Sequence, residues 1–187
     1  MKYQTVEQSF SYGHRVWGAA NKCSHIHGHS AIVKLELHTP IENDQPNFCW
    51  LERFIRSNLE GKMLVDINDP FINGILDGAD ITTEHTYVRL SKHYGNEVLS
   101  LEPINEGINH QMMGYRINVD HWDDEPKRQF YGSFTLVNFN PTDFNCSKWI
   151  GDLALAHLCS TRWTIEQVSW HRDSLSSTTF ITTETGA

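Results

Sequence analysis

The sequence lacks any apolar run long enough to cross a membrane as a helix, and residues 1–14 lack the apolar centre of a secretory signal peptide. A surplus of positive charge is also missing, because 15 lysines and arginines stand against 23 aspartates and glutamates, for a formal net charge of −8. Nucleic acids and anionic membranes select proteins with a basic surface, so this balance disfavours both as partners. We expect a cytoplasmic protein. A phosphorylated small molecule stays compatible as a ligand, because a local pocket can be basic in an acidic protein.

Cysteine is scarce, and the four cysteines form no Cys-x-x-Cys pair and no dense framework. Secreted disulfide scaffolds show such frameworks, so we expect reduced thiols rather than structural disulfides. Internal repeats, low-complexity tracts and a second-domain linker are missing as well. A chain of 187 residues can bury a sizeable core, and we expect residues 1–187 to form one domain.

The chain does contain apolar periodicity of two kinds, which predicts an α+β protein. Residues 94–128, rich in glycine, asparagine and charge, are expected to be an insertion outside the core, and residues 13–28 an irregular loop. Alternating or β-branched and aromatic runs predict strands over residues 3–12, 30–39, 129–140, 163–173 and 178–187. Apolar stripes at helical spacing predict helices over residues 47–59, 82–94 and 141–158.

Three histidines lie within five residues of each other, at positions 25, 27 and 29. Alternate residues of an extended chain point to the same face, so His27 and His29 can meet at one ion, with Gly28 between them. Zinc prefers neutral imidazole, and a catalytic zinc site uses three protein ligands and one open position. However, about one His-x-His pair is expected by chance in a chain with 11 histidines. The spacing alone leaves both a metal site and a group of surface histidines open.

The surroundings of the cluster resemble a known family. Residues 10–15 read Phe-Ser-Tyr-Gly-His-Arg, and residues 23–30 read Cys-Ser-His-Ile-His-Gly-His-Ser before an alternating strand. A Phe-containing strand that ends in His-Arg, followed by Cys-x-x-x-His-Gly-His-Ser, resembles the 6-pyruvoyl-tetrahydropterin synthase family. That family includes the bacterial 6-carboxytetrahydropterin synthases of queuosine biosynthesis.

The resemblance implies the tunnelling fold (T-fold), an antiparallel four-stranded sheet with two helices on one face in β-β-α-α-β-β order. It also implies homo-oligomers whose sites lie between subunits. About 80 residues separate the two long helices here, which is more than the family's usual connection, and a structureless loop of that length is improbable. We therefore expect an insertion at about 62–140 that forms an added subdomain over the site or a subunit interface.

By matching position, the resemblance implies that His14, His27 and His29 bind zinc and that Cys23 is the thiol that abstracts a proton. His25 falls at a variable position and is expected not to be a ligand. Three neutral imidazoles leave zinc its full positive charge, which can polarise a substrate hydroxyl or carbonyl. A cation near a thiol favours the thiolate. The alternative for Cys23 is the common one for cysteine, a small buried apolar residue.

The positions that the family uses for proton transfer differ in this chain. The family's Asp-His pair after the first long helix corresponds to Glu60-Gly61. Glutamate can imitate aspartate, but glycine cannot carry a proton. Asp66 is a candidate substitute, and so is a histidine from elsewhere in the chain. Those histidines are His85, His110, His121 and His157.

Positions expected to bind the substrate are only partly kept. Thr142 and the proline before it match the family's Pro-Thr-x-Glu-Asn helix start, and the threonine hydroxyl can cap that helix. Phe144 stands where the family has glutamate. Arg15 follows the first predicted ligand, where it can meet a substrate phosphate or stay solvated.

The family's last strands contain Val-x-Val-x-Glu-Thr, whose glutamate binds the amino-pyrimidine edge of a pterin. A carboxylate suits that edge because it accepts hydrogen bonds from adjacent N–H groups. Here Arg172 occupies the place, followed by Asp173. A guanidinium only donates, so it suits a carbonyl or phosphate, and a shifted register would offer Glu166 or Asp173 instead.

The resemblance therefore implies a zinc-dependent lyase that acts on 7,8-dihydroneopterin triphosphate or a related pterin. Two alternatives stay open. One is a divergent enzyme of the same fold that acts on another purine- or pterin-like ligand. The other is a catalytically silent zinc-binding scaffold.

Overall fold

The computed structural model describes residues 2–41, 48–76, 80–82, 87–89, 98–104, 112–120, 122–173 and 176–181. Its centre is a pair of long antiparallel strands, β1 (Lys2–His14) and β2 (His27–Thr39), which pair along their whole length. β9 (Thr164–Arg172) pairs with the other side of β2, and β10 (Ser176–Ile181) pairs with β9, both antiparallel. These strands form a four-stranded antiparallel sheet in the order β10-β9-β2-β1.

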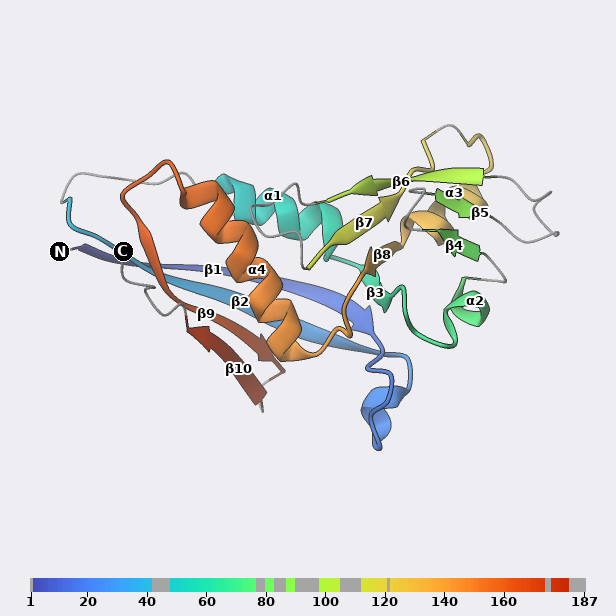
Figure 1. Ribbon diagram of the computed structural model, residues 1–187, viewed down its shortest axis with the longest axis horizontal. Helices are drawn as coiled ribbons and strands as arrows, with labels where there is room; N and C mark the ends of the chain where they lie inside the picture. The colour runs from blue at the N-terminus through green and yellow to red at the C-terminus, as the bar shows by residue number, and fades with distance from the viewer. Residues whose placement is uncertain are drawn as a thin grey trace.

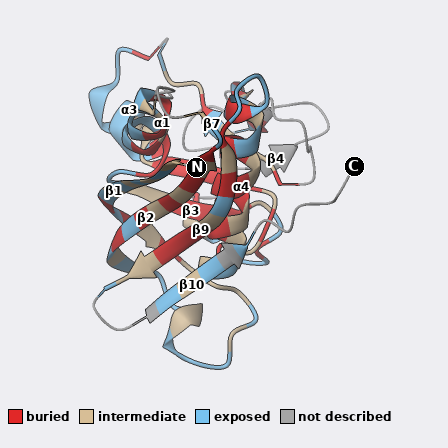
Figure 2. Ribbon diagram, turned by 90° about the vertical axis from the view of Figure 1, so that its left-hand side faces the viewer, coloured by how far each residue is buried: buried red, intermediate tan, exposed pale blue. Residues whose placement is uncertain are grey.

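Alternation along β1 and β2 decides which face of this sheet is covered. Side chains at every second position, such as Phe10, Tyr12 and Leu35, are buried, while those between them are exposed or half-buried. Two helices, α1 (Cys49–Asn58) and α4 (Asp143–Leu158), pack on the buried face (Figure 1). In Figure 2 the edge strand β10 is largely exposed, whereas β9 beside it carries several buried residues.

Beyond β1 the sheet continues. β3 (Lys62–Asp66) pairs in parallel with the last residues of β1, and β8 (Phe134–Val137) pairs in parallel with β3. The antiparallel strands that follow are β7 (Gly114–Ile117), β6 (Val98–Pro103), β5 (Tyr87–Arg89) and β4 (Asp80–Thr82). The described residues thus form a ten-stranded mixed sheet.

The strands β3 to β8 and the helices between them are called the extension below. The extension carries two short helices, α2 (Ile72–Ile75) and α3 (Glu125–Gly132), at the end of the molecule opposite the N-terminus (Figure 1). It has a hydrophobic core of its own, which includes the fully buried Leu99, Tyr131 and Leu136. No helix in the described part of the chain is long and apolar enough to cross a membrane.

The α+β prediction is confirmed, and the four antiparallel strands and two long helices of the predicted arrangement are present. The predicted loop is shorter than 13–28, because β1 runs to His14 and β2 begins at His27. The predicted strand over 129–140 is wrong up to Gly132, where the chain is still in α3. The Asp124 carboxylate caps that helix by accepting from the Lys127 amide, and Pro126 lies in its first turn.

Two predictions for the extension are wrong where it is described. In the range 82–94, predicted as helix, residues 87–89 form β5 and Thr82 ends β4, and the other residues lie outside the described part. Residues 94–128 were expected outside any core, yet their described part supplies β6, β7 and the buried side chains of Leu99 and Ile117.

Candidate metal centre

The pairing of β1 with β2 brings three histidines together. His14, the last residue of β1, lies opposite His27, the first residue of β2, and His29 lies opposite Tyr12. All three side chains point to the helix-covered face, because each lies an even number of residues from a buried residue of its own strand, Tyr12 on β1 or Ala31 on β2. Their ligand atoms all lie within 4.8 Å of one another. One ion can therefore be reached by all three.

Each imidazole is held through its Nδ1 atom. His14 Nδ1 donates to the carbonyl of Pro141 at 2.7 Å, and His27 Nδ1 donates to the carbonyl of His25 at 2.7 Å. His29 Nδ1 lies 2.8 Å from a carboxylate oxygen of Asp173. A carbonyl can only accept, so the proton of His14 and of His27 sits on Nδ1 and the lone pair on Nε2. Ligating histidines in metalloproteins have such partners on their other nitrogen.

The Nε2 atoms of His14 and His29 are buried and meet no hydrogen-bond partner among the described residues. A buried polar atom without a partner costs free energy, so a pair of them at one point calls for a bound group. Burial lowers the pKa of His14 to about 4, which keeps this fully buried imidazole neutral at neutral pH. Three converging imidazoles and a nearby cavity fit a zinc ion. His25 contributes only its carbonyl to this arrangement.

A cavity of about 360 Å³ adjoins the cluster. Cys23 lies half-buried on its wall, in a 3-10 turn (Lys22–Ser24) in which the amide of Cys23 donates to the side-chain oxygen of Asn21. The cavity wall also includes His14, Thr142, Asp143, Phe144 and Arg172. The structure thus places the predicted thiol, one predicted ligand and two predicted substrate-binding residues around one space.

Asp143 was not predicted from the sequence as a site residue. It is the first residue of α4, and one of its oxygens lies 3.6 Å from Nε of Arg172. Its other oxygen, Oδ1, is buried and has no hydrogen-bond donor among the described residues. Burial raises the pKa of this carboxyl, against the opposing effect of Arg172. One signal in the sequence could have found it. The family's glutamate is replaced by Phe144, and Asp143 is the carboxylate next to that position.

The predicted relay residues lie elsewhere. Glu60 accepts a hydrogen bond from the amide of Ser11 and lines a different cavity, of about 630 Å³, together with Ser30 and Asp173. Asp66 is buried and accepts hydrogen bonds from Trp17 and Asn68. Neither is among the described residues that line the cavity of His14 and Cys23.

The other candidate groups are also placed away from the cluster or cannot be placed. His85, His110 and His121 lie outside the described residues. His157 stacks on Trp50, with ring centroids 4.5 Å apart. Glu166 lies 3.0 Å from His38, so it is not the carboxylate beside the three histidines. That carboxylate is Asp173, which has left-handed backbone geometry (φ 52°) in the turn after β9.

Comparison with known proteins agrees with this architecture. The model of the family described as 6-pyruvoyl tetrahydropterin synthase matches residues 3–183. No curated protein matches the chain. An uncharacterized protein of Wolinella succinogenes has a solved structure with a TM-score of 0.72 and 21% sequence identity, over 96% of this chain and 97% of that one.

A second solved structure is the 6-pyruvoyltetrahydropterin synthase of Plasmodium vivax, in a form with a mutated catalytic residue. It gives a TM-score of 0.51 at 14% identity, over 96% of both chains. At such identities the two structures establish a shared fold. The family match extends over nearly the whole chain, from the strand that ends in His14 to the strand after Arg172. The chain belongs to the 6-pyruvoyl tetrahydropterin synthase family.

Proposed function

We propose that this protein is a zinc-dependent lyase resembling 6-pyruvoyl- or 6-carboxytetrahydropterin synthase, acting on 7,8-dihydroneopterin triphosphate or a related pterin. One observation carries the proposal. Three imidazoles converge beside a cavity that is also lined by a half-buried thiol, and the buried Nε2 atoms of two of them have no hydrogen-bond partner among the described residues. A structural metal site needs no reactive group outside its ligand set, whereas proton abstraction needs a base beside the metal, and a thiolate can serve as one.

His14, His27 and His29 would hold the metal. A bound zinc ion supplies positive charge that polarises a substrate oxygen and makes an adjacent C–H proton easier to remove. The protein's own contribution is to orient the three imidazoles. It does so through two carbonyl groups and the carboxylate of Asp173.

Cys23 is the proposed base. Of the four cysteines it is the one that lines the cavity beside His14. Cys146 is fully buried in the core, which raises its thiol pKa strongly, and Cys49 and Cys159 are exposed on other elements. A base must reach the proton that it removes, and only Cys23 has that access among these thiols.

Asp143, Arg172 and Thr142 are the proposed substrate-binding groups. The edge of a pterin ring offers both N–H donors and a carbonyl acceptor. The unpartnered Oδ1 of Asp143 can accept from such N–H groups, while the guanidinium of Arg172 donates to an acceptor. Asp173, also predicted to bind substrate, is already paired with His29, which supports a role in holding the metal ligand.

Glu60 and Asp66 stay predictions as proton-transfer residues. Both have hydrogen-bond partners elsewhere, and neither lines the cavity of Cys23 in the same chain. The contacts of one chain therefore give no support to a proton-transfer role for either residue. We also propose that residues 1–187 form one domain, with residues 62–140 as an insertion, and that the protein is a homo-oligomer with sites between subunits. The sheet face without α1 and α4 supports assembly, because it exposes Tyr3 and Ile32.

A divergent ligand is the second candidate. The observation in its favour is Phe144, which is half exposed at the cavity wall where the family has glutamate. An aromatic side chain can stack on a planar ring but cannot accept its N–H groups. The enzyme would then act on another purine- or pterin-like compound.

The test begins with metal analysis of the purified protein, followed by incubation with 7,8-dihydroneopterin triphosphate. Release of triphosphate or loss of the pterin side chain is expected from the zinc-loaded protein. Cys23→Ser should lose turnover and keep zinc, His27→Ala should lose both, and the exposed Cys159→Ser serves as the matched control. Zinc without turnover of this substrate would overturn the leading proposal, and binding of the pterin without turnover would favour the second candidate.

A further inference from the structure

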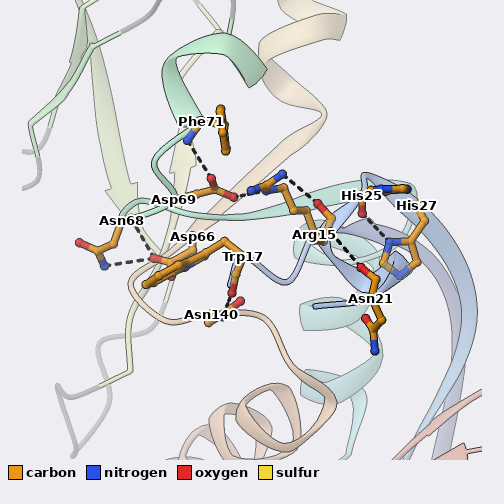
Figure 3. Close-up of polar contacts among 11 residues, drawn as sticks. Arg15, Trp17, Asn21, His25, His27, Asp66, Asn68, Asp69, Phe71 and Asn140 are labelled. Atoms are coloured by element: carbon orange, nitrogen blue, oxygen red, sulfur yellow. Dashed lines mark hydrogen bonds and ion pairs between the residues drawn. The ribbon is translucent and has the colours of Figure 1, made fainter. Parts of the chain in front are cut away.

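The loop between His14 and Cys23 is tied to the extension by two buried carboxylates (Figure 3). This loop matters because it starts at one predicted zinc ligand and ends at the proposed base. Within the loop, the amide of Val16 donates to the carbonyl of Cys23 at 2.8 Å. The Nη1 group of Arg15 donates to the carbonyl of Ser24 at 2.8 Å. Both bonds hold the backbone at Cys23 and at the residue that follows it.

Arg15 is itself held from the extension. Its Nε group lies 2.6 Å from Oδ2 of Asp69, and the side chains are 18% and 2% exposed. Its guanidinium also lies over the ring of Phe71, 4.9 Å from the ring centre. Asp69 is fixed in turn, because its other oxygen accepts from the amide of Phe71 at 2.8 Å. A charged pair of this burial has one defined geometry rather than many.

A second contact joins the loop to Asp66, three residues before Asp69. Trp17 Nε1 donates to Oδ2 of Asp66 at 2.5 Å, and Oδ1 of Asp66 accepts from the backbone and side-chain N–H groups of Asn68. The carbonyl of Trp17 accepts from the side chain of Asn140, the residue before the proline that orients His14. The turn from β3 into α2 therefore holds the first half of the loop at two points (Figure 3).

We propose that Asp69, acting through Arg15, is a positioning residue that sets the place of Cys23 relative to the three imidazoles. The inference rests on the proposed function for its catalytic consequence, but its structural part does not. It reassigns Arg15, because the Nε and Nη1 groups that would bind a substrate phosphate are already engaged by Asp69 and Ser24. It also gives residues 66–69 of the extension a part in the site.

The test compares Asp69→Asn, Arg15→Gln and the double variant with the zinc-loaded wild type. Asp123→Asn is the matched control, since this carboxylate precedes α3 in the extension and is exposed. Three readouts are needed: zinc affinity, amide hydrogen exchange along the chain, and the alkylation rate of Cys23 followed by mass spectrometry of its peptide. Steady-state kinetics on the pterin substrate adds a fourth.

Both single variants should raise exchange in residues 16–24 about tenfold or more, and change the alkylation rate of Cys23, with exchange in β1 and β2 unchanged. Zinc affinity should stay within about threefold, because the ligands sit on paired strands. The kcat should fall about tenfold to hundredfold at a nearly constant KM, since misplaced catalytic groups cost rate rather than binding. The double variant should be no worse than either single variant.

Three results would overturn the proposal. If Arg15→Gln raises KM and Asp69→Asn leaves both constants unchanged, Arg15 binds substrate instead. If exchange rises throughout the chain and zinc is lost, Asp69 only supports folding. If exchange and alkylation stay at wild-type values, no positioning exists.

Failure of the proposed function remains distinguishable, because a wild type without turnover still gives the exchange and alkylation results. Should Asp69→Asn not fold, Arg15→Lys tests the same link. Lysine keeps the charge for Asp69 but cannot also donate to Ser24 through a second N–H group in the same plane. Raised exchange in residues 16–24 is expected there too, and unchanged exchange would contradict the proposal.

Discussion

At the scale of single residues, the partner of each Nδ1 atom decides which nitrogen is free to bind a metal. Two of these partners are backbone carbonyls, which substitution cannot remove. The third is the side chain of Asp173, which reaches His29 from the turn after β9. This carboxylate adds negative charge beside the cluster and so can raise the basicity of one ligand. It is the part of the ligand support that a point variant can test.

Asp173→Asn is expected to weaken zinc binding about tenfold while leaving the fold intact. Asparagine keeps an acceptor for His29 and tolerates the left-handed backbone at this position, so the variant removes mainly the charge. Competition with a chelator of known affinity measures the effect. Glu166→Gln is the control, because it changes the carboxylate of another histidine pair, with His38. Equal zinc affinities in the wild type and Asp173→Asn would contradict the assignment.

The buried His14 predicts how the metal-free protein responds to acid. Burial lowers the pKa of His14 from 6.5 to about 4, so the unfolded chain binds a proton on this residue before the folded chain does. The stability contributed by the neutral form is complete above pH 6.5, falls as the pH drops below that value, and is gone below about pH 4. The total is on the order of 3 kcal/mol.

Urea unfolding in the presence of a chelator, at intervals from pH 7.5 to 4, measures this contribution. His14→Gln should flatten the profile in this window, because the residue that titrates is gone. A wild-type profile and a variant profile with the same slope would show that His14 is not neutral in the folded protein.

The cluster of three histidines, with Cys23 at the cavity beside His14, could be predicted because its pattern is local, within residues 10–30. Their supporting groups could not. The Pro141 carbonyl that orients His14 is 127 residues away along the chain, and Asp173 is 144 residues from His29. Asp143 had no expected role until the fold placed it on the cavity wall with one buried oxygen that has no donor among the described residues.

At the scale of elements, the start of α4 combines three tasks. The hydroxyl of Thr142 accepts a hydrogen bond from the amide of Asn145 and so caps the helix. The residue before it orients His14, and the residue after it, Asp143, lines the cavity. A frayed helix start would therefore disturb both the orientation of His14 and the cavity wall at Asp143.

Thr142→Ala should lower the free energy of unfolding by about 1 kcal/mol, through loss of the cap. Thr142→Ser keeps the hydroxyl and should retain most of the stability. Chemical denaturation without substrate gives both values. The cap assignment fails if the serine variant loses as much as the alanine variant.

Elements differed in how well they could be predicted because they differ in length and pairing. β1 and β2 each have 13 residues, and their long alternation identifies them. β5 has three residues, of which Val88 is buried, so nothing in its sequence separates it from part of a helical stripe. Its strand character comes from pairing with β4 and β6.

At the scale of the whole molecule, two hydrophobic cores share one sheet. Neighbouring residues of β8 point to opposite faces, and Val137 belongs to the core under α1 and α4 while Leu136 belongs to the core of the extension. The link to the four-stranded sheet is short, since β3 pairs with only three residues of β1. Parallel pairing of this kind joins segments about 50 residues apart, which no periodicity in the sequence encodes.

Gly114 of β7 packs closely against the helix α4 of the other part. A Cβ atom at this position would lie 2.5 Å from Cζ2 and 3.0 Å from Cη2 of Trp149 on α4. Trp149 is fully buried in the first core, so its ring cannot move aside without displacing its neighbours. Gly114→Ala should therefore lower the free energy of unfolding by about 1–3 kcal/mol.

The control for this variant is Gly74→Ala in α2, where a Cβ atom would meet nothing within 4 Å. Alanine favours a helix more than glycine does, so this change should be neutral or slightly stabilising. Tryptophan fluorescence and amide exchange of α4 during denaturation report the loss of stability in the core under α1 and α4, although the substitution is in the extension. If Gly114→Ala instead leaves α4 unchanged and destabilises only β6 and β7, the two cores unfold independently and the extension is not part of the same cooperative unit.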